Sequence, residues 1–455
     1  MMSSEDFKFL DESKVTGRHW QITILSAMGT FLDGYDISII GVALTIIVGI
    51  PSFHYAVTPL GKGLMAASTS IGMLIAGLLG GYLSDLRGRR FLYMWDMAVF
   101  IIFTALMSLA LSYWDLFIYR LILGLAIGTD YALTPTMISE ISPVKPRGKM
   151  LAVSTTMWWV GSVVAYVIGF LLLPLGINSW RYMFAIGLIP AIIVLILRRT
   201  VPESARWYAM KGEVEKAQLS EKSVVGHADD LSKVKKQKVS ILTLFDKRFI
   251  KGTIFFGIAW FAYDVAFYGI GLFNPYILSL FGLTHRLAVL GSAVFAIFGI
   301  LGGLISLLTV DKWGRKVDTA IGFLGMTVSL LILAYIAYTV PKDAFTVGST
   351  AVLIVSMFIL FEVTNTWGLG TTCFIYGQEL FPTSIRSTGQ GWGVTISRIG
   401  AVLSLTTFPT IVALYGLGSG LLFFAITGAF LGLVVTLLLA PETKQKSLEE
   451  LEKGY

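Results

Sequence analysis

The sequence is poor in the residues on which most catalytic and metal sites depend. A single cysteine, Cys373, excludes a disulfide framework and a cysteine-based metal site. The four histidines fall outside the long apolar segments or at their edges, so no histidine metal site or Ser-His-Asp relay is expected in the core. No Gly-x4-Gly-Lys-Ser/Thr loop occurs, which argues against an ATP-driven pump. These absences predict a protein that is not an enzyme and needs no metal or cofactor.

Charged residues are also scarce, and apolar residues dominate. Of the 455 residues, 14% are charged and 55% are hydrophobic, and the mean hydropathy is +0.76, which is far too apolar for a water-soluble chain of this length. Apolar runs of about 20 residues, enough to cross roughly 30 Å of hydrocarbon as a helix, recur along the whole sequence. The fold class expected is therefore an all-α membrane protein. We expect its twelve transmembrane helices at 21–46, 60–84, 91–111, 114–139, 150–174, 179–197, 250–279, 287–309, 319–340, 348–376, 390–415 and 418–440.

The positions of lysine and arginine predict which way the protein is inserted. In the twelve-helix arrangement, when the helix ends are counted with the adjoining loops, 29 of the 35 basic residues fall in the termini and one set of loops, 4 fall in the other set, and 2 fall deep inside helices. By the positive-inside rule, both termini face the cytoplasm in a multi-pass protein of the cell membrane. The net charge of +7 is scattered over these loops and forms no patch, so no nucleic-acid partner is expected.

The second half of the chain repeats features of the first. "SDLRGRR" (84–90) follows the second helix and "VDKWGRK" (310–316) follows the eighth, while "EISPVKPRG" (140–148) matches "ELFPTSIRS" (379–387). Two similar six-helix halves with a site between them are what alternating access requires. We therefore expect a six-helix bundle at 1–199, a cytoplasmic linker with short helices at 200–248, and a second six-helix bundle with a tail at 249–455.

These repeats resemble the major facilitator superfamily over essentially the whole chain. The family's loop after the second helix has glycines that permit a tight turn, together with an acid and bases that can form an ion cluster closing the cytoplasmic side. The resemblance implies a pseudo-symmetric twelve-helix transporter and a cytoplasmic gate. The gating residues expected from both copies are Asp85, Arg89, Arg90, Glu140, Arg147, Asp311, Arg315, Glu379 and Arg386.

Several ionisable residues fall inside the expected helices, where a charge costs about 2.5–3.5 kcal/mol even on lenient insertion scales. They must therefore face a cavity or pair with one another. A buried carboxylate can also take up a proton near neutral pH, which is the basis of proton coupling. Protons are favoured over sodium because these acids can titrate directly. The embedded set is Asp33, Asp36, Arg120, Asp130, Asp264, Glu362 and Arg398.

One stripe of the expected seventh helix combines an acid with two aromatic side chains. Trp260, Asp264 and Tyr268 follow one another at four-residue spacing, so they share a helix face and extend over about 12 Å. An indole N–H and a phenol beside an acid that can be neutralised suit an anionic or polyhydroxylated solute.

A narrower resemblance, to the plant and fungal phosphate:proton symporters, covers the fourth and seventh helices. "RLILGLAIGTDY" ends in Asp130 and Tyr131 as that family's fourth helix does, and Trp260, Asp264 and Tyr268 have its seventh-helix spacing. The resemblance implies proton transfer through Asp33, Asp36 and Asp130, and Asp264, as an embedded acid, is also expected to take part. It implies solute contacts from Tyr131, Trp158, Trp260, Asp264, Tyr268 and Arg398.

The chain departs from that family at two positions. Trp158 stands where the family has a phosphate-contacting glutamine, and Gly370 stands where it has an asparagine. These changes remove polar partners and favour a flatter, more carbon-rich solute. We therefore expect a proton-coupled symporter, foremost for inorganic phosphate, with an organic or aromatic acid or a sugar as alternatives. Trp158 and Trp367 are expected as walls of the pocket.

The alternatives depend on resemblances of their own. "LDGYD" (32–36) and an arginine in the eleventh helix resemble the aromatic-acid:proton symporters. "PESARW" (202–207) and "PETK" (441–444) resemble the sugar porters. We expect the chain to act as a monomer, with the lipid bilayer, protons and one small solute as its partners.

Overall fold

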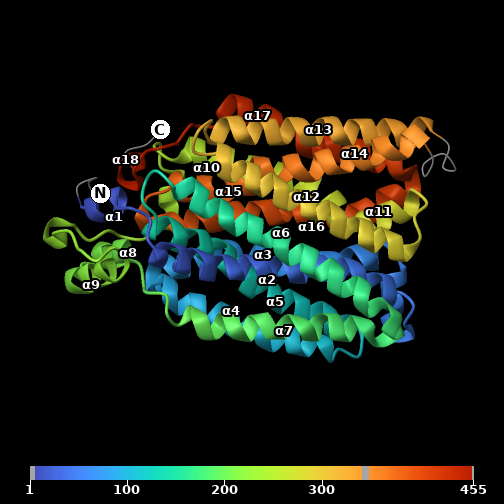
Figure 1. Cartoon of the computed structure of the whole chain (residues 1–455), viewed down its shortest axis with the longest axis horizontal. Helices are drawn as coiled ribbons and strands as arrows, with labels where there is room; N and C mark the ends of the chain where they lie inside the picture. Colours follow the sequence, from blue (N-terminus) through green and yellow to red (C-terminus); the bar gives the residue numbers. More distant parts are fainter. Residues whose placement is uncertain (1–5, 341–347, 453–455) are drawn as a thin grey trace.

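The computed structural model describes residues 6–340 and 348–452, and every regular element in these ranges is a helix. Two bundles of long helices lie side by side (Figure 1). The N-terminal bundle contains α2 (Gly17–Ile47), α3 (Pro59–Arg87), α4 (Arg89–Ser108), α5 (Tyr113–Ile141), α6 (Arg147–Leu172) and α7 (Ser179–Arg198). The C-terminal bundle contains α10 (Ile250–Ile270), α11 (Asn274–Leu280), α12 (His285–Thr309), α13 (Arg315–Thr339), α14 (Gly348–Asn365), α15 (Thr371–Glu379), α16 (Arg386–Phe424) and α17 (Leu431–Leu439).

The helices give twelve membrane crossings in the part of the chain that the structure describes. Ten helical stretches are long and apolar enough to span a bilayer, but two of them, Arg147–Arg198 and Thr383–Leu439, contain 52 and 57 residues. A straight helix of that length would extend over about 80 Å, so each must contain two crossings. The chain turns back inside them at Gly176 (φ 78°) and Gly416 (φ 83°), in a backbone region open to glycine. The predicted all-α fold with twelve transmembrane helices is confirmed.

Three of the predicted spans are interrupted helices; in 418–440 a π-helical segment, Ala425–Phe430, separates α16 from α17. A short 3-10 turn, Gly271–Phe273, separates α10 from α11, and Pro275 follows at the second position of α11. A π-helical segment, Thr366–Gly370, separates α14 from α15, and the backbone at Gly368 leaves the helical region there. An interruption of this kind leaves backbone N–H and C=O groups without their helical partners and redirects side chains. In membrane transporters, interrupted helices occur where a helix lines a site.

The two bundles repeat the same turn in detail. Gly88 before α4 has φ 107°, and Gly314 before α13 has φ 103°. At each turn one glutamate accepts hydrogen bonds from the first two backbone N–H groups of the following helix: Glu203 for α4 and Glu442 for α13. A carboxylate at a helix N-terminus is favoured by the helix dipole and by the free N–H groups. The internal repeat predicted from the sequence therefore exists as matched local structure.

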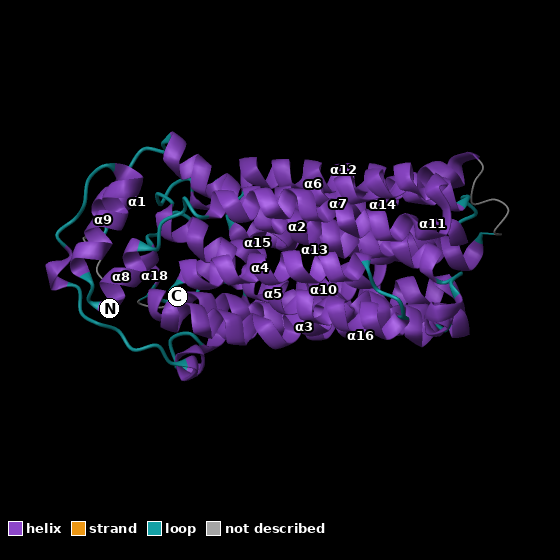
Figure 2. Ribbon diagram, turned by 90° about the horizontal axis from the view of Figure 1, so that it is seen from below, coloured by secondary structure: helices purple, strands orange, loops and turns teal. Residues whose placement is uncertain are grey.

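Short helices cover one end of the bundles. They are α1 (Lys8–Glu12), α8 (Ala205–Lys211), α9 (Val214–Val225) and α18 (Leu448–Leu451), and they gather at the same end of the molecule (Figures 1 and 2). Helices α8 and α9 fall within the predicted linker. That this end faces the cytoplasm, and that the bundles move as two domains, both remain predictions from the sequence.

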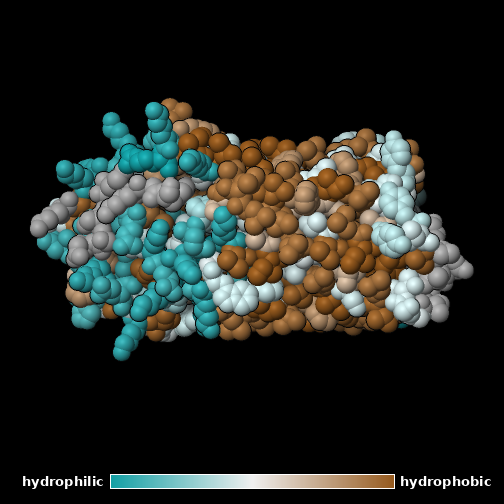
Figure 3. Space-filling model, turned by 90° about the horizontal axis from the view of Figure 1, so that it is seen from above, coloured by the Kyte–Doolittle hydropathy of each residue, from teal (hydrophilic) through white to brown (hydrophobic). Residues whose placement is uncertain are grey.

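The outer surface of the bundles is apolar. Figure 3 shows a broad hydrophobic band along the long helices and hydrophilic side chains over the end covered by the short helices. Large apolar side chains exposed on this surface have no protein neighbour to bury them, so a lipid phase must surround them. Examples are Ile102, Ile118, Leu171, Ile189, Leu308 and Leu438.

Candidate functional site

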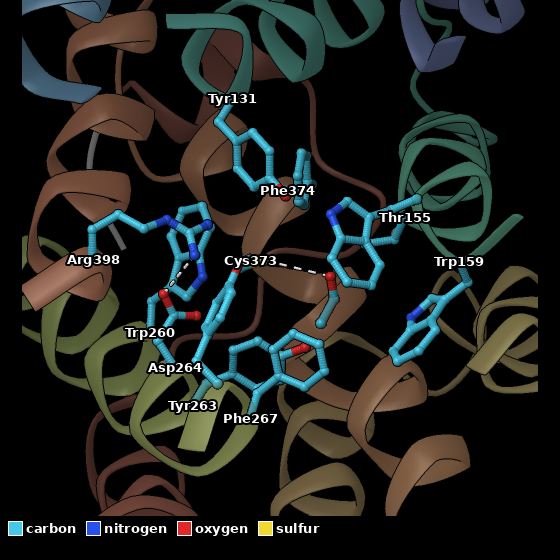
Figure 4. Close-up of a pocket in the computed structure, with 13 residues that line it drawn as sticks. Tyr131, Thr155, Trp159, Trp260, Tyr263, Asp264, Phe267, Cys373, Phe374 and Arg398 are labelled. Carbon is cyan, nitrogen blue, oxygen red and sulfur yellow. Dashed lines mark hydrogen bonds and ion pairs between the residues drawn. The ribbon is translucent and has the colours of Figure 1, made fainter. Parts of the chain in front are cut away.

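A small cavity lies between the two bundles and brings together all six residues predicted to contact the solute. Its volume is about 40 Å³, which is room for a few water molecules and no more. Tyr131 comes from α5, Trp158 from α6 and Arg398 from α16, while α10 supplies the stripe predicted in the seventh helix (Figure 4). The full lining is Tyr131, Thr155, Trp158, Trp159, Trp260, Tyr263, Asp264, Phe267, Tyr268, Gly370, Cys373, Phe374 and Arg398.

The charged centre of the cavity is one ion pair. Arg398 donates from Nη1 to Oδ2 of Asp264 over 3.0 Å, and both side chains are buried (Figure 4). The guanidinium also lies over the rings of Tyr131 and Tyr268, 5.1 and 4.9 Å from their centroids. Such cation–π contacts strengthen when water is excluded. The arginine is thus held in place by one carboxylate and two aromatic faces.

Three polar atoms of the cavity residues are buried without a hydrogen-bond partner among the described residues: Nε of Arg398, Oδ1 of Asp264 and Nε1 of Trp158. A buried polar group without a partner costs about 1–3 kcal/mol. Two donors and one acceptor are therefore available to a bound molecule in the same small space.

About half of the residues that line the cavity were not predicted from the sequence. Tyr263 and Phe267 sit beside the predicted stripe of α10, while Cys373 and Phe374 follow the π-helical break, whose effect on direction the sequence did not reveal. The expectation that Trp367 forms a pocket wall is wrong. Its indole N–H donates to the Thr309 hydroxyl over 3.0 Å, and its ring lies against Trp313, away from the cavity.

Asp36 and Arg120, both predicted inside the membrane, form a pair in the N-terminal bundle. Arg120 Nη1 lies 3.4 Å from Asp36 Oδ2, and neither of these atoms makes a hydrogen bond within the described residues. The Nε of Arg120 donates to the Ser68 hydroxyl over 3.1 Å. The pair is fully buried, and its closest contact is longer than an ordinary charge-assisted hydrogen bond.

Asp130 has a different partner, which the sequence analysis did not find. Arg198, at the end of α7, contacts Asp130 at 2.8 Å and Asp96 of α4 at 3.1 Å. Asp33 lies within electrostatic range of this group, and its Oδ2 is buried without a hydrogen-bond partner among the described residues. Arg198 was not predicted as an embedded base because it lies just beyond the apolar run 179–197. Asp96 lies inside the run 91–111 and was detectable as an embedded acid.

Glu362 is the one embedded acid in α14, and it belongs to neither ion pair. It accepts a hydrogen bond from the Asn274 side chain over 2.9 Å and a longer one from Asn365 over 3.4 Å. It therefore ties α14 to the start of α11, at the break after α10.

Four of the predicted gating residues join the two bundles at the end covered by the short helices. Asp85 accepts from the backbone N–H and the hydroxyl of Thr388 in the other bundle, over 2.8 and 2.6 Å. Arg89 binds Asp85 at 3.0 Å and Glu140 at 3.1 Å. Glu140 in turn contacts Arg386, across the bundle boundary, at 3.0 Å. All of these charged side chains are buried.

The corresponding residues of the C-terminal bundle form a similar ion cluster. Arg315 contacts Asp311 at 2.9 Å and Glu379 at 2.8 Å. Asp311 also accepts from the backbone N–H of Lys149 in the first bundle over 3.0 Å. Burial raises the pKa of Asp311 above its ordinary value, and the neighbouring Arg315 opposes that rise.

Two further predicted gating residues contact other partners. Arg147 contacts Asp11 of α1 at 3.5 Å and donates to the Lys446 carbonyl over 3.1 Å, so it engages the terminal segments. Arg90 donates to the Arg199 carbonyl over 2.9 Å and stays within the first bundle. Their spacing in the sequence matched the motif, but only the fold shows which partner each base reaches.

The opposite end of the bundles is also in contact. Gly63 of α3 packs closely on Leu405 and Thr406 of α16, and the Lys62 ammonium lies 5.0 Å from the Tyr276 ring centroid. The two bundles thus touch at both ends, and a pocket of about 200 Å³ remains between them at this end, lined by Lys62 and Tyr276 among others. Among the described residues, no cluster of three or more His, Cys, Asp or Glu is placed to hold a metal.

Repeated six-helix bundles, a buried site between them and ion pairs joining them at one end define a membrane transporter of the major facilitator type. The chain belongs to the sugar (and other) transporter family, whose model matches residues 22–455. The members of this family are transporters and not enzymes.

Individual relatives agree with this family. The putative metabolite transport protein YaaU of Escherichia coli (strain K12) is 30% identical over 99% of this chain and 97% of its own length. The D-xylose-proton symporter of the same strain is 27% identical over 95% of each chain. The crystal structure of the proton:xylose symporter XylE bound to 6-bromo-6-deoxy-D-glucose has the same fold, with a TM-score of 0.81 and 24% identity over 96% of this chain and 98% of its own. These comparisons support the sugar and metabolite alternative and give no support to the phosphate subfamily.

Proposed function

We propose that this protein is a proton-coupled symporter that carries one small organic metabolite across the membrane by alternating access. The observation that carries this proposal is the buried pair Asp36–Arg120, which lies in the membrane and whose closest atoms are 3.4 Å apart. A named D-xylose-proton symporter among the relatives supports proton coupling by analogy.

The pair can couple proton binding to a change of state. An ionised Asp36 needs Arg120 beside it, because a lone buried carboxylate is expensive. A protonated Asp36 no longer holds the arginine, which can then move with its helix. Protonation of Asp36 thus selects between two arrangements of α2 against α5. A ligand can shift the population of such a two-state element.

Asp130 and Asp33 have a second role in this proposal. Arg198 stands between Asp130 and Asp96, so this group contains one base for three acids when Asp33 is included. Such a cluster is stable without water only if it holds at least one proton. It supplies a proton reservoir on the same bundle as Asp36.

We consider two classes of cargo. Relatives named for D-xylose and for glucose support a sugar. An arginine in the cavity supports an organic acid. Both were alternatives in the prediction from sequence, and the family assignment favours the sugar over phosphate.

The proposal can be tested by following protons directly. The purified protein is reconstituted into liposomes that contain a pH-sensitive dye, and candidate solutes are added outside at equal pH on both sides. A symporter must acidify the lumen as the solute enters, and Asp36→Asn must abolish that acidification. Lys216→Gln, which removes an exposed linker base, serves as the control. Solute entry without any lumenal acidification would contradict the proposal.

A further inference from the structure

The cavity's side chains restrict the chemistry of the cargo more than the family does. Among the described residues that line it, none carries a side-chain amide and none is a lysine; one amide, that of Asn274, lines an adjoining pocket that shares Trp158, Trp159, Phe267 and Tyr268. Amides serve sugar hydroxyls well because each offers a donor and an acceptor. The charged groups here are one guanidinium and one carboxylate, and the other polar groups are hydroxyls, indoles and a thiol.

Arg398 has unused binding capacity. Of its five N–H donors, one binds Asp264 through a single contact of 3.0 Å, another reaches the Tyr268 hydroxyl, and Nε has no partner among the described residues. A guanidinium binds a carboxylate most strongly in a bidentate fork. The two tyrosine rings that flank it fix the plane in which such a fork must form.

The remaining walls are aromatic and apolar. Trp158, Trp159 and Phe267 pack edge to face with ring centroids 5.0–5.8 Å apart, and Phe374 lies 5.4 Å from Tyr131. Such walls favour a flat, carbon-rich body. The unpartnered indole N–H of Trp158 provides one further donor for a polar atom at its edge.

We infer that the cargo is a small organic monocarboxylate with an aromatic or apolar body, whose carboxylate binds Arg398 in place of Asp264. This rests on the proposed proton-coupled symport. Asp264, once displaced, is a buried carboxylate without a cation, so it takes up one proton from the aqueous side as the anion enters. One anion and one proton enter the site together, the arginine keeps one negative partner throughout, and no net charge is added to the buried site.

Benzoate is the probe, and benzamide is its neutral counterpart of the same shape. Binding to the purified protein is followed by quenching of the cavity tryptophans and by protection of Cys373, the chain's single cysteine, from a thiol reagent. We expect saturable benzoate binding and at least tenfold weaker binding of benzamide. Above the pH at which Asp264 ionises in the empty site, benzoate affinity should fall about tenfold per pH unit, since one proton is bound with it.

Variants separate the roles of the two charged residues. Arg398→Gln should weaken benzoate binding at least tenfold, and Arg398→Lys should give partial recovery because it restores charge without the fork. Asp264→Asn should bind benzoate with no pH dependence. Arg286→Gln removes an arginine that is exposed and lies over Phe170, and it should bind as the unmodified protein does.

The outcomes distinguish this inference from the proposed function. If D-xylose or inorganic phosphate protects Cys373 while benzoate at millimolar concentration and mildly acidic pH does not, the cargo inference is overturned. The symport proposal then still stands if that solute acidifies the liposome lumen. If benzoate binds through Arg398 but its entry carries no proton, the cargo inference stands and the symport proposal fails.

Discussion

Asp85 and Asp311 occupy matching positions in the two bundles, and each accepts a hydrogen bond from the N-terminal end of a helix in the opposite bundle. Asp85 accepts from the backbone N–H of Thr388 in α16 over 2.8 Å, and Asp311 from that of Lys149 in α6 over 3.0 Å. Helix N-termini attract carboxylates through free N–H groups and the dipole. Both contacts therefore join the two bundles at the same end of the molecule, and both do so by pairing a carboxylate with a helix N-terminus.

The gate at the end covered by the short helices should open when Glu140 loses its charge. Glu140→Gln leaves Arg89 and Arg386 buried without their shared carboxylate, and removing one partner of a buried pair costs about 3–5 kcal/mol. That cost falls on the closed state, so states open toward this side should gain population. Faster reaction of Cys373 with a membrane-impermeant thiol reagent added at this side would show the opening.

A matched control for the gate lies in the linker. Glu213 pairs with Lys216 at 2.7 Å on the surface, and exposed pairs contribute at most about 1 kcal/mol. Glu213→Gln should leave Cys373 labelling unchanged. Equal labelling rates for Glu140→Gln and Glu213→Gln would show that the Glu140 cluster does not hold the gate shut.

Gly314→Ala should destabilise the second motif. Gly314 has φ 103° and ψ 163°, a region that only glycine occupies readily, and an added Cβ would lie 2.3 Å from Oε2 of Glu442. We expect a loss of about 1–3 kcal/mol, seen as a lower melting temperature. Gly17→Ala at the start of α2, where a Cβ meets nothing within 4 Å, is the control and should be neutral. A Gly314→Ala protein as stable as the control would mean that the turn relaxes freely.

Arg198 should stabilise the fold mainly by neutralising the repulsion between Asp96 and Asp130. Arg198→Gln leaves Asp96 and Asp130 buried together without a cation, at a cost of about 3–5 kcal/mol. Asp96→Asn in the same chain removes one of the two charges and should recover part of the lost stability. Thermal unfolding of the two single variants and the double variant measures this coupling. Additive losses would show that the three residues act independently.

The docking of α9 should weaken as the pH rises. Glu221 is buried and accepts from the Asp229 backbone N–H over 3.0 Å, and burial, reinforced by the nearby Asp229 charge, raises the pKa of Glu221 from 4.5 to about 8. The folded linker therefore holds this proton more tightly than the unfolded linker does. Its stabilising effect is complete below pH 4.5 and is lost as the pH rises to about 8.

Hydrogen exchange across 214–234 tests this pH dependence. After correction for intrinsic rates, protection should fall between acidic and alkaline pH in the unmodified protein. It should be flat in Glu221→Gln, while Glu215→Gln, an exposed glutamate of the same helix, should behave as the unmodified protein does. A pH-dependent loss that persists in Glu221→Gln would assign the effect to another group.

The sequence predicted site residues correctly where functional side chains recur at a regular helical spacing or in a repeated motif. Asp264 and its aromatic neighbours at four-residue intervals predicted one face of the cavity, because helix geometry alone places them together. Gly88 and Gly314 were predicted as tight turns because their motifs repeat, and both have positive φ.

The partners of the charged residues were much less predictable. Arg198 reaches Asp130 from a helix end 68 residues away in sequence, and Arg147 turns toward Asp11 of α1. Neither contact follows from local spacing, because each depends on how distant helices pack. Phe374 and Cys373 reach the cavity through a π-helical break at Thr366–Gly370, which local sequence does not specify.

The most direct test of the central claim compares accumulation with exchange in Asp36→Asn. Asparagine keeps the shape of the side chain and removes its ability to bind and release a proton, so coupling is lost while the cavity remains. In liposomes with an imposed pH gradient, the unmodified protein should concentrate its solute inside, and Asp36→Asn should not. With labelled and unlabelled solute on opposite sides and no gradient, both proteins should exchange the label at similar rates. Gradient-driven accumulation by Asp36→Asn equal to that of the unmodified protein would contradict the account.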